Sequence, residues 1–416
     1  MNITIHRGTN QIGGCVTEYE YNGWRLFVDY GEQLPGSPDL NYPLEIEGLT
    51  QGDVRKSALL ITHYHGDHIG KIAEISTDIP IYMGKLSKEI AYELAKHLSG
   101  VSSDNRELAE RLESVKTFTA GEQFSFGEFR IMPIVMDHSA FDSYAFGIEA
   151  GNLRIFHTGD FRIHGFRSSK LPIVIDRFIG KVDYVVCEAT NVNRPNAISL
   201  SEYGLQRKFT DSFRENKFNV VYVSSTNIDR LFSIYHAAIR TGREFLIDGY
   251  QKKMMDIVSG RDSIWGKSKF YQYVKGREPK QLKYQKDSEF LVTDSFKTLL
   301  DKRGYVIIAR STPRFDNLLS RLPATNRKVY LSQWNGYLAP ENKAFNFALA
   351  KSVGPKYEYF HTSGHCNMQS LENLINQLHP KAIIPIHTDN PRAFANFFRD
   401  KWPVILLRDG ESFLIR

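Results

Sequence analysis

The chain has 416 residues, of which 42% are hydrophobic and 24% are charged. This length exceeds one average domain and suits two, with room for a large core, and the composition is ordinary for a globular protein. The net charge of +6 is compatible with a polyanionic partner but does not require one. No apolar run is long enough to span a membrane, and no low-complexity tract or internal repeat occurs, so we expect no membrane partner.

The N-terminal residues and the cysteines indicate a cellular compartment. Residues 1–8 have no apolar core of the kind found in signal peptides and are predicted to form a first strand. Cys15, Cys187 and Cys366 are scattered and show no CxxC spacing. Three isolated thiols indicate a reducing environment without a disulfide framework, so the predicted location is cytoplasmic.

In chain order, short strands with few helices come first, and one helix is clear at residues 85–98. Near residues 200–345 the pattern changes to alternating strands and helices, which predicts a parallel sheet covered by helices. The elements expected there are strands at 219–223, 244–248, 305–309 and 328–331 and a helix at 228–239. A helix at 371–378 and a strand at 382–387 follow. The predicted fold class is therefore α/β, with one domain made of residues 1–195 and 346–416 and an inserted domain at 196–345.

The densest chemical signal is the segment His63-Tyr64-His65-Gly66-Asp67-His68, directly after the apolar run at 58–61. Imidazole and carboxylate groups suit zinc and similar cations. His63 and His65 lie two residues apart and can chelate one ion, whereas Asp67 and His68 are better placed to face a second. The alternative is a polar, solvated turn, but four ligand-type residues this close together favour a metal site.

Three later strands end in further candidate ligands. His138 lies in residues 135–139, which end the alternating stretch at 129–134. Asp160 belongs to the Gly-Asp turn that closes the segment at 153–160, and His387 ends the strand at 382–387. A histidine after a strand is more often a loop or capping residue when it occurs alone. Together with the dense segment, these three residues predict a cluster that holds two ions. A bound ion can make hydroxide from water near neutral pH.

These motifs, with Asp29 in Phe27-Val28-Asp29-Tyr30-Gly31, resemble the five motifs of the metallo-β-lactamase superfamily in order and context. Further motifs look like those of its β-CASP group of nucleases: residues 186–190 resemble motif A, residues 360–365 motif B and residues 384–387 motif C. Residues 221–230 are similar to the start of the inserted domain of the ribonuclease J family. The resemblance covers the whole chain and implies a metallo-β-lactamase αββα sandwich with an inserted β-CASP-type α/β domain.

The resemblance implies roles for individual residues. His63, His65 and His138 would hold the first metal, and Asp67, His68 and His387 the second. Asp160 would bridge the two ions, with a nucleophilic water or hydroxide between them. Asp29 would orient a ligand imidazole. The implied cofactor is two Zn²⁺ ions, with Mn²⁺ as an alternative, in a cleft between the two domains.

The expected catalytic residues are Asp67, within the metal set, and Glu188 and His365, at the scissile phosphate or its leaving oxygen. Phosphodiester hydrolysis needs a protonated leaving group, which His365 oriented by Glu188 could supply. The alternatives are a surface carboxylate for Glu188 and a loop histidine for His365. Ser224, Ser225, Ser363 and Gly364 are candidates for a substrate-phosphate pocket, of the kind that in the ribonuclease J family underlies 5′-to-3′ trimming.

Basic and aromatic residues alternate between Arg261 and Phe290. Such a segment can track phosphates and stack bases, but the interleaved acidic residues favour a solvated segment whose aromatic side chains pack into the inserted domain.

The function predicted first is a zinc-dependent ribonuclease on single-stranded RNA that uses a two-metal-activated water, with 5′-to-3′ exonuclease action as one form. A hydrolase of the same fold that acts on DNA or a small phosphoester is the second hypothesis, and a nucleic-acid-binding protein without catalysis is the third. The complete ligand set argues against the third. The sequence leaves the oligomeric state open.

Overall fold

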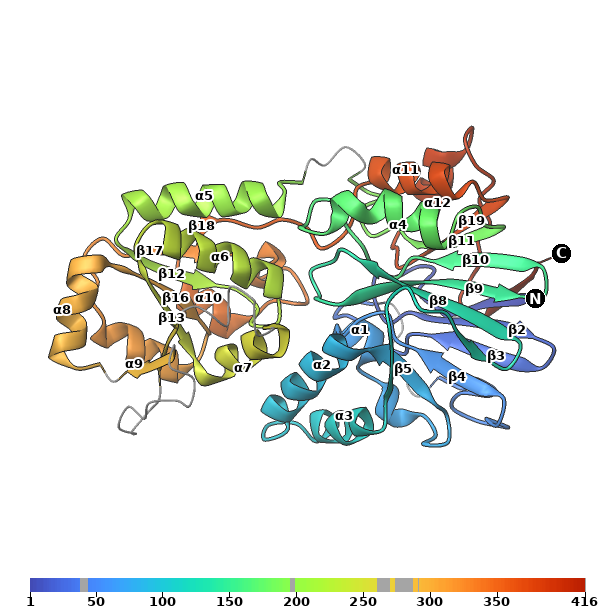
Figure 1. The fold of residues 1–416 in the computed structure, drawn as a ribbon, viewed down its shortest axis with the longest axis horizontal. Coiled ribbons are helices and arrows are strands. Elements are labelled where there is room, and N and C mark those ends of the chain that lie inside the picture. The colour runs from blue at the N-terminus through green and yellow to red at the C-terminus, as the bar shows by residue number, and fades with distance from the viewer. Residues whose placement is uncertain (38–43, 195–198, 260–269, 274–286, 291, 416) are drawn as a thin grey trace. The chain divides into compact units, whose positions relative to one another are not determined.

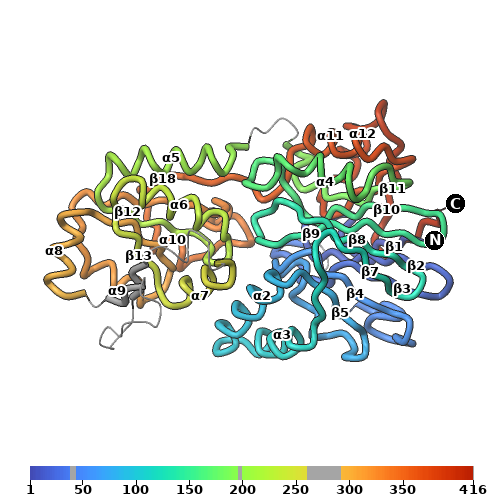
Figure 2. Tube along the Cα trace, in the orientation of Figure 1, coloured from blue at the N-terminus to red at the C-terminus, as the bar shows by residue number. Residues whose placement is uncertain are grey.

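The computed structural model describes residues 1–37, 44–194, 199–259, 270–273, 287–290 and 292–415. The chain forms two compact units, one made of Met1–Ser199 with Gly364–Arg416 and one made of Leu200–Ser363. Figure 2 follows the chain out of the first unit after its green segment and back into it in its red segment. The return comes later than the predicted residue 346, because Glu358–Tyr359 (β18) still pairs with Lys328–Leu331 (β17) in the inserted unit.

The first unit contains two mixed sheets. In order across the first sheet, the strands are β20 (Glu411–Leu414), β1 (Asn2–Arg7), β2 (Val16–Tyr21), β3 (Trp24–Val28), β4 (Ser57–Leu60), β5 (Ile81–Gly84) and β6 (Lys116–Phe118). In order across the second sheet, they are β19 (Ala382–Ile386), β11 (Tyr184–Glu188), β10 (Leu153–His157), β9 (Ser143–Ala150), β8 (Phe129–Met136) and β7 (Phe124–Phe126). In each sheet, one of the two edge strands (β20 or β19) comes from the chain beyond the insertion.

The two sheets pack face to face through a shared apolar core. Ile3, Leu26 and Leu60 of the first sheet join Phe146 and Ile155 of the second in one cluster of buried side chains. Outside the second sheet lie the helices α4 (Leu171–Phe178), α11 (Met368–Leu378) and α12 (Pro391–Phe398), and beside the first sheet lie α1 (Gly66–Ile69), α2 (Lys85–Leu98) and α3 (Ser103–Glu113) (Figure 1). These four layers confirm the predicted αββα sandwich.

The strand directions bring the predicted motifs to one edge. β10 runs parallel to β11, and β11 runs parallel to β19. β8 points the same way, because both β8 and β10 pair antiparallel with β9. In the first sheet, β3 and β4 are parallel. The carboxyl ends of neighbouring parallel strands meet at one edge, so the residues that follow these strands can converge.

The second unit has a seven-stranded sheet in which every pairing is parallel. Its other strands are β12 (Phe218–Tyr222), β13 (Glu244–Asp248), β14 (Phe270–Tyr273), β15 (Asp287–Phe290) and β16 (Tyr305–Ala309). Parallel strands need crossover connections, and six helices are described here: α5 (Glu202–Glu215), α6 (Ile228–Arg240), α7 (Gly249–Val258), α8 (Asp294–Arg303), α9 (Pro313–Arg321) and α10 (Phe347–Val353). Helices α5 and α6 lie on one side of the sheet and α8 and α9 on the other (Figure 1).

Three findings bear on the remaining sequence predictions. Cys15, Cys187 and Cys366 are free and buried. Among the residues that the structure describes, no helix is both long and apolar enough to cross a bilayer. The basic and aromatic segment at 261–290 lies outside the described residues, apart from the backbone of β14 and β15.

Candidate metal centre

The histidine-rich segment is held in place by backbone contacts from two other loops. Tyr30 N–H donates to the carbonyl of His68 at 2.9 Å, and Gly14 N–H donates to the carbonyl of Asp67 at 3.0 Å. A Cβ atom at Gly31 would lie 1.9 Å from the backbone of Asp67. Only glycine therefore fits at position 31, where it allows the loop after β3 to pack directly on the loop after β4.

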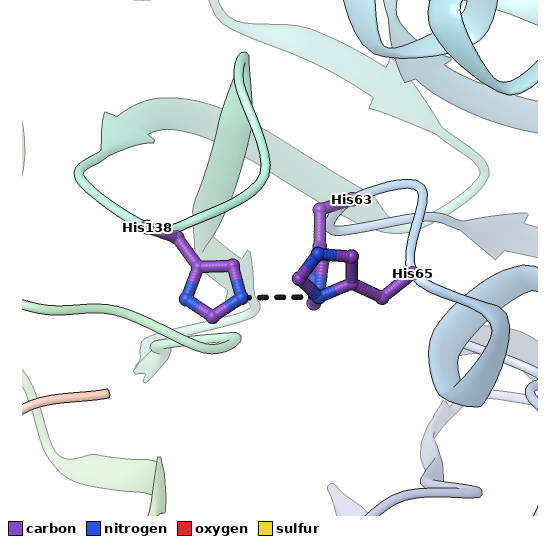
Figure 3. A group of neighbouring side chains, drawn as sticks. All are labelled: His63, His65 and His138. Carbon is purple, nitrogen blue, oxygen red and sulfur yellow. Dashed lines mark hydrogen bonds between the residues drawn. The ribbon is translucent and has the colours of Figure 1, made fainter. Parts of the chain in front are cut away.

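His63, His65 and His138 form the first group of ligand-type side chains, and Figure 3 shows their rings converging. Nε2 of His63 lies 3.1 Å from Nδ1 of His65, which lies 3.2 Å from Nε2 of His138. In a tetrahedral zinc site with Zn–N bonds of about 2.0–2.1 Å, ligand nitrogens are roughly 3.3 Å apart. The three nitrogens therefore have the spacing of ligands that face one ion.

The electrostatics of this group also suit a cation. Burial lowers the pKa of His63 and His138 well below the usual value for histidine, and lowers the pKa of His65 to about 4. The imidazoles are thus neutral at physiological pH. Neutral imidazole is the form that binds a metal ion.

A second group contains Asp67, His68 and His387. Asp67 Oδ2 lies 3.2 Å from His387 Nε2 and 3.7 Å from His68 Nε2. Asp160 joins the two groups, because it shares one ligand set with His63 and His68 and another with His387. Its Oδ2 lies 3.2 Å from His68 Nε2 and 3.5 Å from His387 Nε2. Burial opposes ionisation of Asp160, but the imidazoles of His387, His68 and His365 hold its pKa well below the usual value.

The outer nitrogens of the imidazoles have fixed partners. Asp29 accepts hydrogen bonds from His68 Nδ1 at 2.7 Å and from the hydroxyl of Thr62 at 2.8 Å. The carbonyl of Gly364 accepts from His138 Nδ1 at 2.6 Å. Asp29 and His387 both have positive φ angles, +63° and +52°. Non-glycine residues rarely adopt this backbone conformation, and it tends to occur at functional sites.

Glu188 and His365 lie beside the second group. His365 Nδ1 lies 3.0 Å from Glu188 Oε2, and the hydroxyl of Thr190 donates to the same oxygen at 2.6 Å. Burial would lower the pKa of His365, but the carboxylates of Glu188 and Asp160 raise it to about 9. Its side chain is 22% exposed, whereas those of His68 and His387 are 2% exposed. Of these three histidines, His365 is therefore the one that solvent and a substrate can reach.

All the side chains predicted as metal ligands or acid–base groups meet in the first unit. The predicted phosphate residues divide differently: Ser224, Ser225 and Ser363 belong to the second unit. Ser225 is buried, Ser224 Oγ lies 2.9 Å from Thr226 Oγ1, and the acidic Asp229 sits in the first turn of α6 just beyond. Their binding of a substrate phosphate stays a prediction.

Sequence reasoning missed four residues that organise the site: Thr62, Asp137, Arg162 and Thr190. Each is within two residues of a motif residue, but at least one of its partners lies far away along the chain. Asp137, for example, accepts from the guanidinium of Arg162 at 2.8 Å, and both side chains are fully buried. The sequence signal that could have identified Asp137 is its position directly before His138.

The donor set fits metal ions. His68 Nε2 is buried and makes no hydrogen bond, although it points toward Asp160 at 3.2 Å. A buried imidazole nitrogen without a hydrogen bond is costly in an apoprotein, and a cation would satisfy it. His63, His65 and His138 with Asp160 could hold one ion, and Asp67, His68 and His387 with Asp160 another.

Two family models match the chain. Residues 42–204 match the Beta-lactamase superfamily domain, and residues 352–406 match the Zn-dependent metallo-hydrolase RNA specificity domain. The first range holds most of the candidate ligands, and the second holds His365 and His387. The two models therefore cover the site from both sides of the insertion.

Individual proteins also match. Ribonuclease J of Mycobacterium tuberculosis (strain H37Rv) is 24% identical, over 93% of this chain and 68% of its own length. Ribonuclease J of Helicobacter pylori (strain 26695) is 25% identical, over 92% of this chain and 55% of its own length. A solved structure of a protein of unknown function from Enterococcus faecalis V583 matches with a TM-score of 0.76 at 20% identity, over 100% of this chain and 99% of that one, which supports the fold.

Proposed function

Because the chain belongs to the metallo-β-lactamase superfamily and resembles the β-CASP nucleases of the ribonuclease J type, we propose that it is a zinc-dependent ribonuclease that hydrolyses phosphodiester bonds of single-stranded RNA. The observation that carries the proposal is the convergence of seven buried or half-buried ligand-type side chains beside the Glu188–His365 pair. A site that only binds metal ions would not need an acid–base pair such as Glu188–His365.

The chain's own residues divide the work. When two ions are bound, they supply an activated water and neutralise charge on the phosphoryl oxygens. The proposed ligands are His63, His65 and His138 on one side, Asp67, His68 and His387 on the other, and Asp160 between them. Asp29 fixes the imidazole of His68 through its Nδ1.

His365 is proposed to protonate the leaving oxygen. Glu188 holds its Nδ1 at 3.0 Å, and Glu188 is itself fixed by the N–H of Phe161, which donates to Oε1 at 2.9 Å. The imidazole is thereby oriented while its side chain keeps solvent access. A positioned acid of this kind typically contributes about 10²–10⁴-fold to the rate.

The test combines metal content with turnover. Protein purified without chelator should contain more than one equivalent of zinc by elemental analysis. It should cut a labelled single-stranded oligoribonucleotide faster than the matching oligodeoxyribonucleotide, and a chelator should abolish the activity. A variant with His63→Ala and His65→Ala, checked for folding by circular dichroism, is the control against a contaminating nuclease.

Three other results would contradict the proposal in different ways. Equal cutting of RNA and DNA would make the protein a general phosphodiesterase. Turnover of a small phosphoester but neither oligonucleotide would remove nucleic acid as the substrate. Tight binding of RNA without turnover, in protein that holds both ions, would leave a binding protein on the same fold.

A further inference from the structure

Thr190 lies between the Glu188–His365 pair and the candidate ligand His387. It follows Glu188 by two residues, after β11. Its Oγ1 lies 2.6 Å from Glu188 Oε2, 2.8 Å from His387 Nδ1 and 3.2 Å from His365 Nδ1. One hydroxyl therefore contacts a carboxylate and two imidazoles, but it has only one proton to donate.

The hydrogen-bond inventory fixes the direction of these contacts. An ionised carboxylate only accepts hydrogen bonds, so the short contact with Glu188 uses the one proton of the hydroxyl. The oxygen must then accept at its contact with His387, and the proton of that bond belongs to His387 Nδ1. The other nitrogen, Nε2, lies 3.2 Å from Asp67 Oδ2 and 3.5 Å from Asp160 Oδ2, where a bound cation would take the place of the hydrogen-bond contact with Asp67.

The same arrangement occurs on the other side of the site. The hydroxyl of Thr62 donates to Asp29 Oδ2 at 2.8 Å and lies 3.0 Å from His63 Nδ1. In both cases a carboxylate accepts a hydrogen bond from the threonine hydroxyl, and the threonine oxygen accepts a hydrogen bond from the outer nitrogen of a candidate ligand. Partners that fix the outer nitrogen of a ligand imidazole set its tautomer and orientation.

We infer that Thr190 is a positioning residue that holds His387 in the Nδ1–H tautomer and so directs Nε2 to the second metal. The inference rests on the metal set of the proposed function. Because Glu188 Oε2 also bonds His365, Thr190 links the orientation of the ligand His387 to that of the proposed acid His365. Without the hydroxyl, His387 Nδ1 loses its acceptor and the imidazole is free to change tautomer.

The experiment compares Thr190→Val, which removes the hydroxyl at nearly constant volume, with Thr190→Ser, which keeps it. Apoprotein is titrated with zinc against a competing chelator. The valine variant should bind the second ion about 10–100-fold more weakly, the cost typical of losing such a partner, and should bind the first ion normally. The serine variant should bind both ions nearly as wild type does. Equal affinity of the valine variant for the second ion would overturn the inference.

A spectroscopic measurement tests the tautomer directly. In zinc-loaded protein with ¹⁵N-labelled histidine, a long-range ¹H–¹⁵N spectrum distinguishes Nδ1–H from Nε2–H, and His387→Gln assigns the resonance. Wild-type His387 should carry its proton on Nδ1, and the valine variant should lose that slowly exchanging proton. A wild-type His387 protonated on Nε2 would overturn the inference, even where the valine variant fails to fold.

These outcomes separate the inference from the proposed function. Wild-type protein that binds only one ion would overturn the second metal site and the role of Thr190 together. Protein that binds two ions, shows the Nδ1–H tautomer and cuts no RNA would overturn the nuclease and support the role of Thr190.

Discussion

Asp160 is a carboxylate that groups with ligands on both sides of the candidate metal centre. It forms one set with His63 and His68, and its Oδ2 lies 3.2 Å from His68 Nε2 and 3.5 Å from His387 Nε2. We expect Asp160→Asn to weaken binding of both ions, because the amide loses the negative charge and one acceptor oxygen. Asp67→Asn should weaken mainly the second ion, because the ligand set of Asp67 among the described residues consists of His68 and His387. Dialysis followed by elemental analysis measures both effects. Retention of two ions by the Asp160 variant would remove the bridge.

His365 contacts Glu188, and its half-buried side chain is 22% exposed. His365→Ala should lower the turnover number on RNA by roughly 10²–10⁴-fold, as expected for loss of a positioned acid. The ions and the fold should remain, because the other candidate ligands complete both groups. Single-turnover kinetics and metal content are measured together. Glu188→Gln is the matched variant and should have a smaller effect, since the amide can still contact Nδ1.

Two contrary results have distinct meanings for His365. A wild-type rate in the alanine variant would leave the imidazole with a packing role only. Loss of one ion would make His365 a ligand, which its position 3.7 Å from Asp160 Oδ2 makes the direct competing assignment.

At the scale of elements, a buried ion pair joins the loops after β8 and β10, which carry His138 and Asp160. Asp137 accepts from Arg162 Nε at 2.8 Å and from the N–H groups of Arg167 and Ser168 at 2.7 and 3.1 Å. Both charged side chains are fully buried. The pair therefore sets the separation of two loops that must present ligands to the same ion.

Asp137→Asn should reduce the free energy of unfolding by about 3–5 kcal/mol, because it removes the negative charge that pairs with the buried Arg162 guanidinium. The double variant Asp137→Asn with Arg162→Met should lose less free energy of unfolding than the sum of the losses of the two single variants, because it removes both charges of the pair. Urea unfolding of the metal-free proteins measures each term. Additive losses would show that the two side chains do not act as a pair.

The sequence predicted the elements wherever a local pattern determined them. The helix at Lys85–Leu98 and the strands Glu244–Asp248 and Tyr305–Ala309 have the predicted bounds, because apolar periodicity and clear stops mark their ends. The metal motifs were also local, since each ligand follows a strand. Thr62, Thr190 and the Asp137–Arg162 pair could not be predicted, because their roles depend on contacts between loops that only the assembled sheets create.

At the scale of the whole molecule, the boundary of the inserted unit shows the same limit. Residues 346–363 carry a helix and a two-residue strand, and nothing in their own sequence says which sheet they join. The parallel pairing of β18 with β17 assigns them to the second unit. This unit also holds Ser224, Ser225 and Ser363, so most of the predicted phosphate-binding residues belong to the inserted domain.

The final prediction concerns where this molecule begins to cut. If hydroxyls and N–H groups of Ser224 and Ser363 in the inserted unit hold a terminal phosphate, RNA with a 5′-monophosphate should be trimmed from that end. A 5′-triphosphate adds charge and bulk to the pocket, and a 5′-hydroxyl removes the anchoring contacts, so both should be cut more slowly. The acidic Asp229 in the first turn of α6 works against this pocket, which makes the outcome informative.

The measurement is a time course on three oligoribonucleotides that differ only at the 5′ end, together with a circular RNA of the same sequence. Single-nucleotide products from the 5′-monophosphate substrate, and an uncut circle, are the expected result. Ser224→Ala should reduce the preference among the three ends without changing the metal content, because its hydroxyl contacts no ligand side chain but bonds Thr226. Efficient cutting of the circle, or equal rates on all three ends, would replace end recognition by an open cleft. The metal chemistry would then be the same, and the enzyme would be an endonuclease.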